Sequence, residues 1–250
     1  MNYLYSNAIV INNDYALLYY IGLKRLLNLN NEIIFTFKTL IEILKILFKI
    51  NISINTKRKN DFIDYLYTLE QLSLVSVNNN IKNNSINDLI YLTFNSEKEK
   101  KYGYSIISDS EINKILSYSG SVDNIKLLNL YCNIVSRIYT PSKHDNRPFC
   151  MQYKYCMPSY KTFKNDGIVQ NRSIIKDYIN ILQDDLNLIK YKNSGYMTKD
   201  NKRIKGCNHY ILTRDYPNEN YDLLFANILE GYKKAKRSEG WNITCNSDRN

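Results

Sequence analysis

The sequence predicts a mainly helical α+β protein, built from two similar domains in tandem and followed by a C-terminal helix. Three observations lead to this fold class. The 250 residues are enough for two domains of ordinary size, each with its own core. The composition, 44% hydrophobic and 23% charged, is typical of a folded globular chain. The same order of sequence segments also occurs twice along the chain.

The repeat begins with a helix that carries paired leucines after an acidic residue, "NDYALLYYIGLKRLL" in one half and "VDNIKLLNLYCNIVSRI" in the other. A short Lys-Thr segment follows, "FTFKTLIEIL" and "PSYKTFKNDG", and then a longer helix, "KNDFIDYLYTLEQLSLVSV" and "NRSIIKDYINILQDDLNLIKY". Asp14 corresponds to Asp123 and Asp64 to Asp177, so only small insertions separate the copies. We expect domains at 1–100 and 110–215, because the charged segment "NSEKEKKYGYS" between them has no apolar period.

In the second copy, apolar residues of the longer helix lie three and four positions apart and form one helical face. These residues are Ile174, Ile175, Tyr178, Ile181, Leu182 and Leu186. A strand is expected to begin at Leu188-Ile189, with 208–213, "NHYILT", returning beside it as a hairpin. The segment "KNSGYMTKDNKRIKG" between them is polar and basic, which is the composition of a flexible hairpin loop.

The region 216–250 is predicted to hold one amphipathic helix, from Tyr221 to about Arg237. Its apolar side is expected to carry Leu223, Leu224, Ile228 and Leu229. Such a helix either packs on a neighbouring domain or pairs with a partner chain.

Basic residues are concentrated in the second half of the chain. The net charge is +10 overall, yet the window from Arg137 to Arg214 holds 15 basic and 6 acidic residues. A local excess of this size indicates a polyanionic partner, nucleic acid first and an anionic membrane surface second. A basic surface that serves only solubility is the alternative.

The order of helix, short helix, turn, longer helix and two-stranded hairpin is that of a winged helix-turn-helix. The segment "PSYKTFKNDGIVQNRSIIKDYINILQDDLNLIKYKN" resembles the part of winged-helix proteins that presents DNA-reading side chains. The tandem arrangement is similar to replication-initiation and regulatory proteins of low-GC bacterial plasmids, phages and integrative elements. The resemblance implies two winged-helix domains that bind double-stranded DNA, and it covers most of the chain as a pattern.

The resemblance implies that the N-terminal part of the second long helix reads the major groove. Asn and Gln pair with adenine and Arg with guanine, while Ser and Lys suit phosphate oxygens. The expected contacts from this helix and the short helix before it are Ser159, Thr162, Gln170, Asn171, Arg172, Ser173 and Lys176. Those of the wing are Lys190, Lys192, Lys199, Lys202, Arg203 and Lys205. Simpler readings stay open, since Asn171 is also a favoured N-cap residue and exposed lysines are often only solvated.

The first copy has a basic cluster at the matching position, Lys57, Arg58 and Lys59, within "NTKRKND". Its surroundings are nearly neutral, and "KILFKINISI" follows the short helix in place of a polar turn. We therefore expect this domain to contribute to self-association, and the protein to form a homodimer.

Several other classes of protein are disfavoured. The apolar stretch 33–50 carries Lys38, Glu42, Lys45 and Lys49, too many charges for a membrane span, and the N-terminus does not resemble a signal peptide, so we expect a cytoplasmic protein. The five cysteines lack disulfide or zinc-ribbon spacing, which predicts reduced thiols without a metal or cofactor.

An enzyme is also disfavoured. A tyrosine nucleophile in metal-dependent DNA nicking needs clustered histidines, and only two histidines occur, at positions 144 and 209. A protein-interaction scaffold built on winged helices remains the alternative to a DNA reader.

Overall fold

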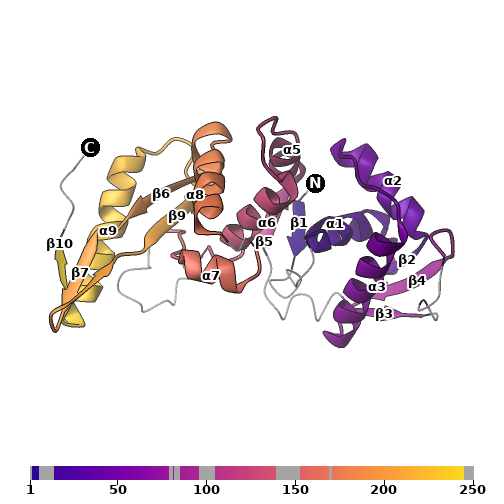
Figure 1. The fold of residues 1–250 in the computed structure, drawn as a ribbon, viewed down its shortest axis with the longest axis horizontal. Coiled ribbons are helices and arrows are strands. Elements are labelled where there is room, and N and C mark those ends of the chain that lie inside the picture. Colours follow the sequence, from indigo (N-terminus) through magenta and orange to yellow (C-terminus); the bar gives the residue numbers. More distant parts are fainter. Residues whose placement is uncertain are drawn as a thin grey trace. The chain divides into compact units, whose positions relative to one another are not determined.

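The structure, a computed structural model, describes residues 2–5, 14–78, 81, 85–95, 105–138, 153–168 and 171–244. It is mixed α+β and mainly helical, which confirms the predicted class. The chain divides into two compact units (Figure 1). The first comprises residues 1–136 with 166–168, and the second comprises residues 137–165 with 169–250.

In the first unit, helix α1 is followed by strand β2, helices α2 and α3, and strands β3 and β4. Their bounds are Ala16–Leu26, Glu32–Phe35, Phe37–Phe48, Thr56–Gln71, Val75–Val77 and Ile90–Phe94, respectively. The last strand lies in the middle of the antiparallel sheet, whose order is β2-β4-β3.

Aromatic packing forms the core of the first unit between the helices and one face of this sheet. The fully buried Phe62 ring lies 5.1 Å from the Tyr19 ring and 5.5 Å from the Phe37 ring, measured between centroids. Burial alternates along β2, where Ile33 and Phe35 are buried. This period-2 pattern is that of a sheet covered on one side.

The first unit extends to Ser136, beyond the domain end expected near residue 100. Strand β5 (Ser105–Ser108) pairs with the N-terminal strand β1 (Asn2–Tyr5), and helices α5 (Asp109–Leu116) and α6 (Asn124–Val135) follow it. The buried Glu111 carboxylate accepts a hydrogen bond from the Tyr131 hydroxyl. The Asn129 side chain donates to the Asp14 carbonyl over 2.8 Å. These buried polar contacts join α6, expected to open the second domain, to the first unit instead.

The second unit begins its regular structure with helices α7 (Tyr160–Asn165) and α8 (Arg172–Asn180), and one π-helical turn, Ile181–Asp185, continues α8. Strands β6 (Ile189–Asn193) and β9 (Asn208–Leu212) then form the predicted hairpin. An isolated bridge joins Cys156 to Tyr210 on the other side of β9. Strand β9 therefore has a backbone partner on each side, a full strand on one and a single bridge on the other.

The predicted flexible loop between β6 and β9 is a second hairpin, so that expectation was wrong. Strands β7 (Tyr196–Lys199) and β8 (Lys202–Lys205) pair directly, and β10 (Asn242–Thr244) adds a third strand beside β7. The polar composition of this segment gave no clear alternation of apolar and polar residues, because only Met197 is buried along β7.

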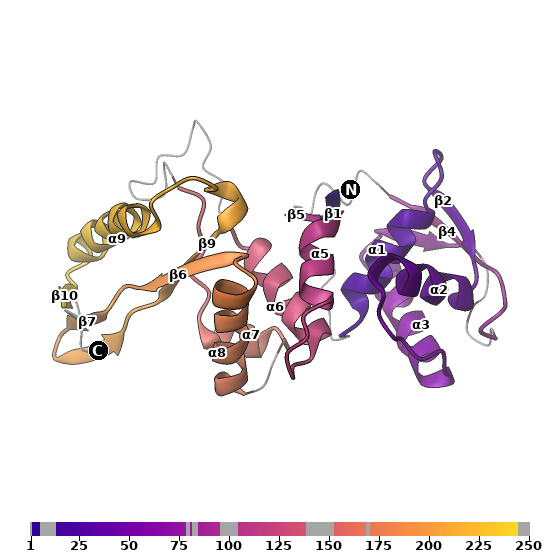
Figure 2. The ribbon, with the colours of Figure 1, turned by 90° about the horizontal axis from the view of Figure 1, so that it is seen from above.

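Helix α9 (Tyr221–Ser238) confirms the predicted C-terminal helix, and it belongs to the core of the second unit. Leu224, Phe225 and Ile228 pack with Tyr155 and Ile211 into one buried cluster. Figure 2 shows α9 running beside the β6–β9 hairpin. Leu223, expected on the apolar side, is 62% exposed, because it lies one position before the buried stripe.

Candidate functional site

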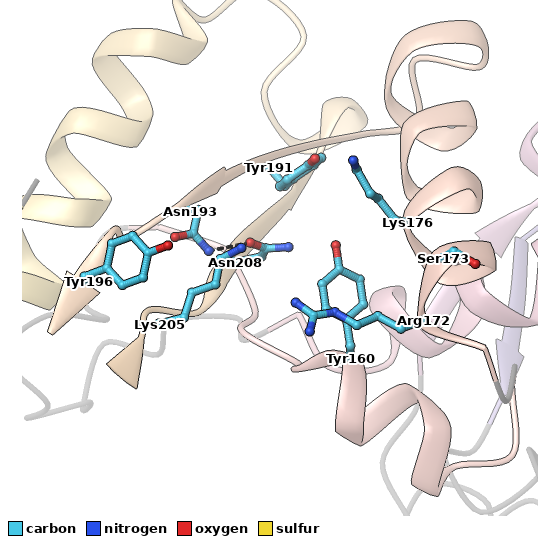
Figure 3. Close-up of a pocket in the computed structure, with 9 residues that line it drawn as sticks. All are labelled: Tyr160, Arg172, Ser173, Lys176, Tyr191, Asn193, Tyr196, Lys205 and Asn208. Carbon is cyan, nitrogen blue, oxygen red and sulfur yellow. Dashed lines mark hydrogen bonds between the residues drawn. The ribbon is translucent and has the colours of Figure 1, made fainter. Parts of the chain in front are cut away.

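The second unit contains an open cleft of about 600 Å³ between helices α7 and α8 and the two hairpins (Figure 3). We call it the basic cleft. The residues that line it are Tyr160, Arg172, Ser173, Lys176, Tyr191, Asn193, Tyr196, Lys205 and Asn208. Four of them were predicted from the sequence as DNA contacts: Arg172, Ser173, Lys176 and Lys205.

Strand alternation decides which hairpin side chains line the cleft. Tyr191 pairs with Tyr210 and Asn193 with Asn208 across β6 and β9. Directly opposite residues in an antiparallel pair have side chains on the same face. This face of the hairpin is turned to α8, and Figure 3 shows Tyr191 and Lys176 approaching each other across the cleft.

The cleft carries positive charge and aromatic rings together. Arg172, Lys176 and Lys205 contribute its cations, and none of the nine lining residues, all of them described, carries a carboxylate. The Arg172 guanidinium carbon lies 5.1 Å from the centroid of the Tyr160 ring, within cation–π range. Such a surface attracts a polyanion and offers aromatic contact area at the same place.

Burial raises the pKa of Tyr191 above its ordinary value, and the neighbouring Tyr160 and Asp184 act in the same direction. Its hydroxyl therefore stays protonated at neutral pH and can donate a hydrogen bond to an anion. A protonated phenol beside lysine and arginine suits a phosphate oxygen.

The two asparagines of the cleft are bound within the hairpin. The Asn193 amide donates to the Asn208 side-chain oxygen over 2.7 Å and to the Gly206 carbonyl over 3.1 Å. The Asn208 amide donates to the Tyr210 hydroxyl over 3.0 Å. These bonds hold the end of β6 against the start of β9, so the asparagines position the wall of the cleft.

Asn171 is the N-cap of α8, which is the alternative that the sequence left open. Its side-chain oxygen accepts from the Ser173 backbone N–H over 2.9 Å and from the Ser173 hydroxyl over 2.8 Å. Gln170, predicted beside it as a DNA contact, lies outside the described residues. The cap leaves Arg172 and Ser173 on the first turn of the helix.

We expect Asn171→Ser to keep the stability and DNA affinity of the protein, because serine caps helices as well as asparagine does. Asn171→Ala, which removes the cap, should lower the free energy of unfolding by about 0.5–2 kcal/mol. Urea denaturation and a DNA titration of both variants test this. A loss of DNA affinity in the stable serine variant would show that the asparagine amide itself contacts DNA.

The side chains of Ser159 and Thr162 interact with each other at the N-terminus of α7. The Thr162 N–H donates to the Ser159 hydroxyl oxygen over 3.0 Å, and the two hydroxyls lie 2.9 Å apart. Ser159 lines a smaller cavity of about 220 Å³ that shares Tyr160, Arg172 and Lys205 with the basic cleft. The pair therefore caps a helix at the margin of the site.

The structure places three of the predicted wing lysines on the face opposite the cleft. Lys190 lies 5.9 Å from the Tyr221 ring centroid, and Lys192 lies 3.7 Å from the Asp222 carboxylate. Lys199 donates to the Glu239 carbonyl over 2.6 Å. All three contact residues of α9 or its C-cap, because they alternate with the cleft-facing residues of β6 and β7.

The remaining wing cations divide in the same way. Lys202 pairs with Lys199, which directs it to the α9 side of the β7–β8 hairpin. Arg203 pairs with Thr198 on the other side, and its guanidinium carbon lies 4.2 Å from the centroid of the Tyr196 ring. Arg203 thus extends the surface of the basic cleft along the hairpin.

The basic cluster of the first unit lies on the first turn of α3. The Arg58 backbone N–H is capped by Asn55, and its guanidinium carbon lies 3.9 Å from the Tyr15 ring centroid. The Arg58 side chain also donates to the Ser53 hydroxyl over 3.1 Å. Lys57 is exposed and Lys59 is half-buried. Arg58 therefore belongs to the packing of its own unit.

Sequence reasoning missed Tyr160, Tyr191, Tyr196, Asn193 and Asn208, which make up more than half of the lining. In β6, Tyr191 and Asn193 alternate with Lys190 and Lys192, and only the two lysines were predicted as polyanion contacts. The period of the strand was the available signal, since one face of a two-stranded hairpin carries every second residue.

We also searched the described residues for a metal site and for a membrane span. Among these residues, no three His, Cys, Asp or Glu side chains lie together as a metal site. Every helix described is too short or too polar to cross a lipid bilayer. Comparison of the chain with protein-family models, with curated proteins and with solved structures finds no match.

Proposed function

We propose that this protein binds double-stranded DNA sequence-specifically through the basic cleft and helix α8 of its second unit. The observation that carries the proposal is the composition of the cleft: three cations and three tyrosines without a carboxylate. Phosphate groups match this charge, and the first turn of α8 adds the partial positive charge of a helix N-terminus.

We further propose that both halves of the chain are winged helices. In the first unit the order of helix, strand, two helices and a two-stranded hairpin, with its last strand in the middle of the sheet, supports this. In the second unit, the bridge at Cys156, helices α7 and α8, and the β6–β9 hairpin follow in the order of strand, two helices and hairpin. The β7–β8 hairpin lengthens the second wing.

In the proposed complex, α8 enters the major groove. Arg172 on its first turn reads guanine, and Lys176 one turn later contacts a phosphate. Tyr191 and Lys205, on the opposite wall, contact the backbone on the side of the wing. Base contacts would supply the specificity, and the phosphate contacts would fix the orientation of the protein.

By the resemblance of its sequence, we propose a replication initiator or a transcription regulator of a mobile genetic element, acting in the cytoplasm. No enzymatic step and no cofactor is part of this proposal. In this proposal the basic cleft serves only to bind DNA.

Titration of the chain against labelled fragments of its own genetic neighbourhood tests the proposal. We expect a preferred fragment, bound about 10³-fold or more tightly than unrelated duplex DNA, and an affinity that falls steeply with salt as counterions are released. Equal binding of all fragments would contradict sequence-specific recognition. Absence of binding at low salt would contradict DNA binding altogether.

A homodimer formed through the first unit is also proposed. Ile34 and Tyr91 are directly paired on the outer face of the β2-β4-β3 sheet and are 62% and 37% exposed. Leu89, two residues before Tyr91 in the chain, is 48% exposed. Clustered exposed apolar residues favour a protein contact, in a dimer or in the alternative scaffold function. The mass of the chain in solution, measured for wild type and Ile34→Lys, tests self-association at this face.

A further inference from the structure

Three side chains with soft or borderline metal-ligand atoms meet behind the β6–β9 hairpin. Cys207 Sγ lies 3.8 Å from Met157 Sδ and 3.6 Å from His209 Nε2. All three residues belong to the second unit. They come from two segments, the strand β9 with its preceding residue and the extended segment before α7.

Strand geometry brings these residues together on one face. Cys207 and His209 are two positions apart at β9, so their side chains lie on the same side. Cys156 is bridged to Tyr210 and therefore shares the opposite face. Met157 follows Cys156, and the alternation turns it toward Cys207.

Among the described residues, His209 makes no strong hydrogen bond. Its ring is fully buried, with its centroid 4.7 Å from the Tyr232 ring and 5.6 Å from the Tyr155 ring. Nδ1 has no hydrogen-bond partner among the described residues, and Nε2 has only the weak contact to the Cys207 sulfur. A buried polar group without a strong partner is costly and calls for an explanation.

We propose that Cys207, His209 and Met157 bind one monovalent copper ion, Cu(I), in a three-coordinate site. Thiolate and thioether ligands select Cu(I) among the common metal ions, and imidazole also suits copper. An ion bound to Cys207 Sγ and His209 Nε2 would give Nε2 a strong partner in place of the weak sulfur contact, while Nδ1 keeps no partner among the described residues.

The two ligand spacings that start at Cys207 Sγ fit such an ion. With metal–sulfur bonds of about 2.3 Å, metal–nitrogen bonds of about 2.0 Å and angles of about 120°, neighbouring ligand atoms lie about 3.7–4.0 Å apart. The observed 3.6 and 3.8 Å lie at or just below this range. A structural zinc site requires a fourth ligand of the nitrogen, thiolate or carboxylate kind, and a thioether is a poor zinc ligand.

The site also has an entry path. Met157 is 36% exposed, and Cys207 lines the smaller cavity beside Arg172 and Lys205. An ion can therefore reach the sulfur atoms from solvent, while the imidazole is held behind them by two aromatic rings. This inference does not rest on DNA binding, because none of the three ligands lines the basic cleft.

Anaerobic competition with the chromophoric chelator bicinchoninate tests the site in the full-length chain. Wild type should withdraw one equivalent of Cu(I) from the chelator complex. Cys207→Ser should weaken Cu(I) binding by more than about 100-fold, because loss of a ligand exceeds the 10–100-fold effect of changes around one. Met157→Leu, which conserves volume, should weaken it by at least about tenfold.

The matched control is Cys150→Ser with Cys245→Ser, which removes two other thiols and should leave the affinity unchanged. X-ray absorption of the wild-type complex should show two sulfur ligands and one nitrogen ligand. Tryptophan fluorescence of each variant verifies that the second unit remains folded. Undiminished Cu(I) binding in Cys207→Ser, a loss that follows the control cysteines, or tighter binding of Zn²⁺ than of Cu(I) would each overturn the assignment.

Discussion

Replacing Arg172 and Lys176 together by alanine is expected to lower the affinity for the preferred DNA fragment by at least tenfold. Loss of an arginine contact to a base costs about 1–3 kcal/mol, and loss of a lysine contact to phosphate adds to it. The dependence of log affinity on log salt should become shallower by about 1–2. Both side chains line the basic cleft from α8, so the loss measures this surface. Fluorescence anisotropy over a range of salt concentrations gives both quantities.

The matched control is the double variant Lys190→Ala with Lys192→Ala. It removes the same charge from the same unit, but both lysines lie on the α9 side of the hairpin. We expect its affinity to stay within about threefold of wild type, since charges on the far side of the hairpin act only through a screened field. Equal losses in the two variants would mean that net charge, and not the cleft, governs binding. No loss in either would favour the scaffold function.

Ile228→Ala should lower the free energy of unfolding of the second unit by about 2–5 kcal/mol, the range for a large aliphatic residue cut back in a core. Ile228 is fully buried in the cluster that joins α9 to Tyr155 and Ile211. The single tryptophan, Trp241, follows α9 and lies in the second unit, so its fluorescence during urea denaturation reports this unit alone.

Leu223→Ala on the same helix is the control. The Leu223 side chain is 62% exposed, so this change should alter the free energy of unfolding by no more than about 0.5 kcal/mol. Similar losses in the two variants would show that the measured effect does not come from burial in this cluster, because alanine itself favours the helix. A negligible loss for Ile228→Ala would contradict the assignment of α9 to the core, and α9 would then be the separate tail that its sequence allowed.

The strongly periodic segments of the fold could be predicted from sequence. The long apolar-faced helix, the hairpin strands at 189 and 208, and the helix from Tyr221 all lie where the pattern placed them. The β7–β8 hairpin was missed because lysines dominate its composition. The unit boundary was missed because it depends on Glu111 and Asn129. Their hydrogen-bond partners are distant in the sequence, so no local pattern could predict them.

The candidate site was predicted only in part, for a related reason. Residue type alone predicted Arg172, Lys176 and Lys205 as polyanion contacts, and the structure brings the three to one cleft. It could not separate Lys205 from Lys199, because that depends on the register of β7 against β8. It also passed over Tyr191, since tyrosine is frequent in this chain and acquires a role only through its neighbours in the fold.

The turn at the tip of the β7–β8 hairpin has a thermodynamic consequence. Asp200 and Asn201 both have positive φ, 51° and 60°, and join the register pair Lys199 and Lys202 directly. Two-residue turns with positive φ match the twist of the strands that they connect. With β10 as a third strand, the hairpin backbone is paired on both sides of β7. In the proposed DNA complex, this paired backbone would lose little conformational entropy on binding, and it would present Arg203 and Lys205 on one sheet.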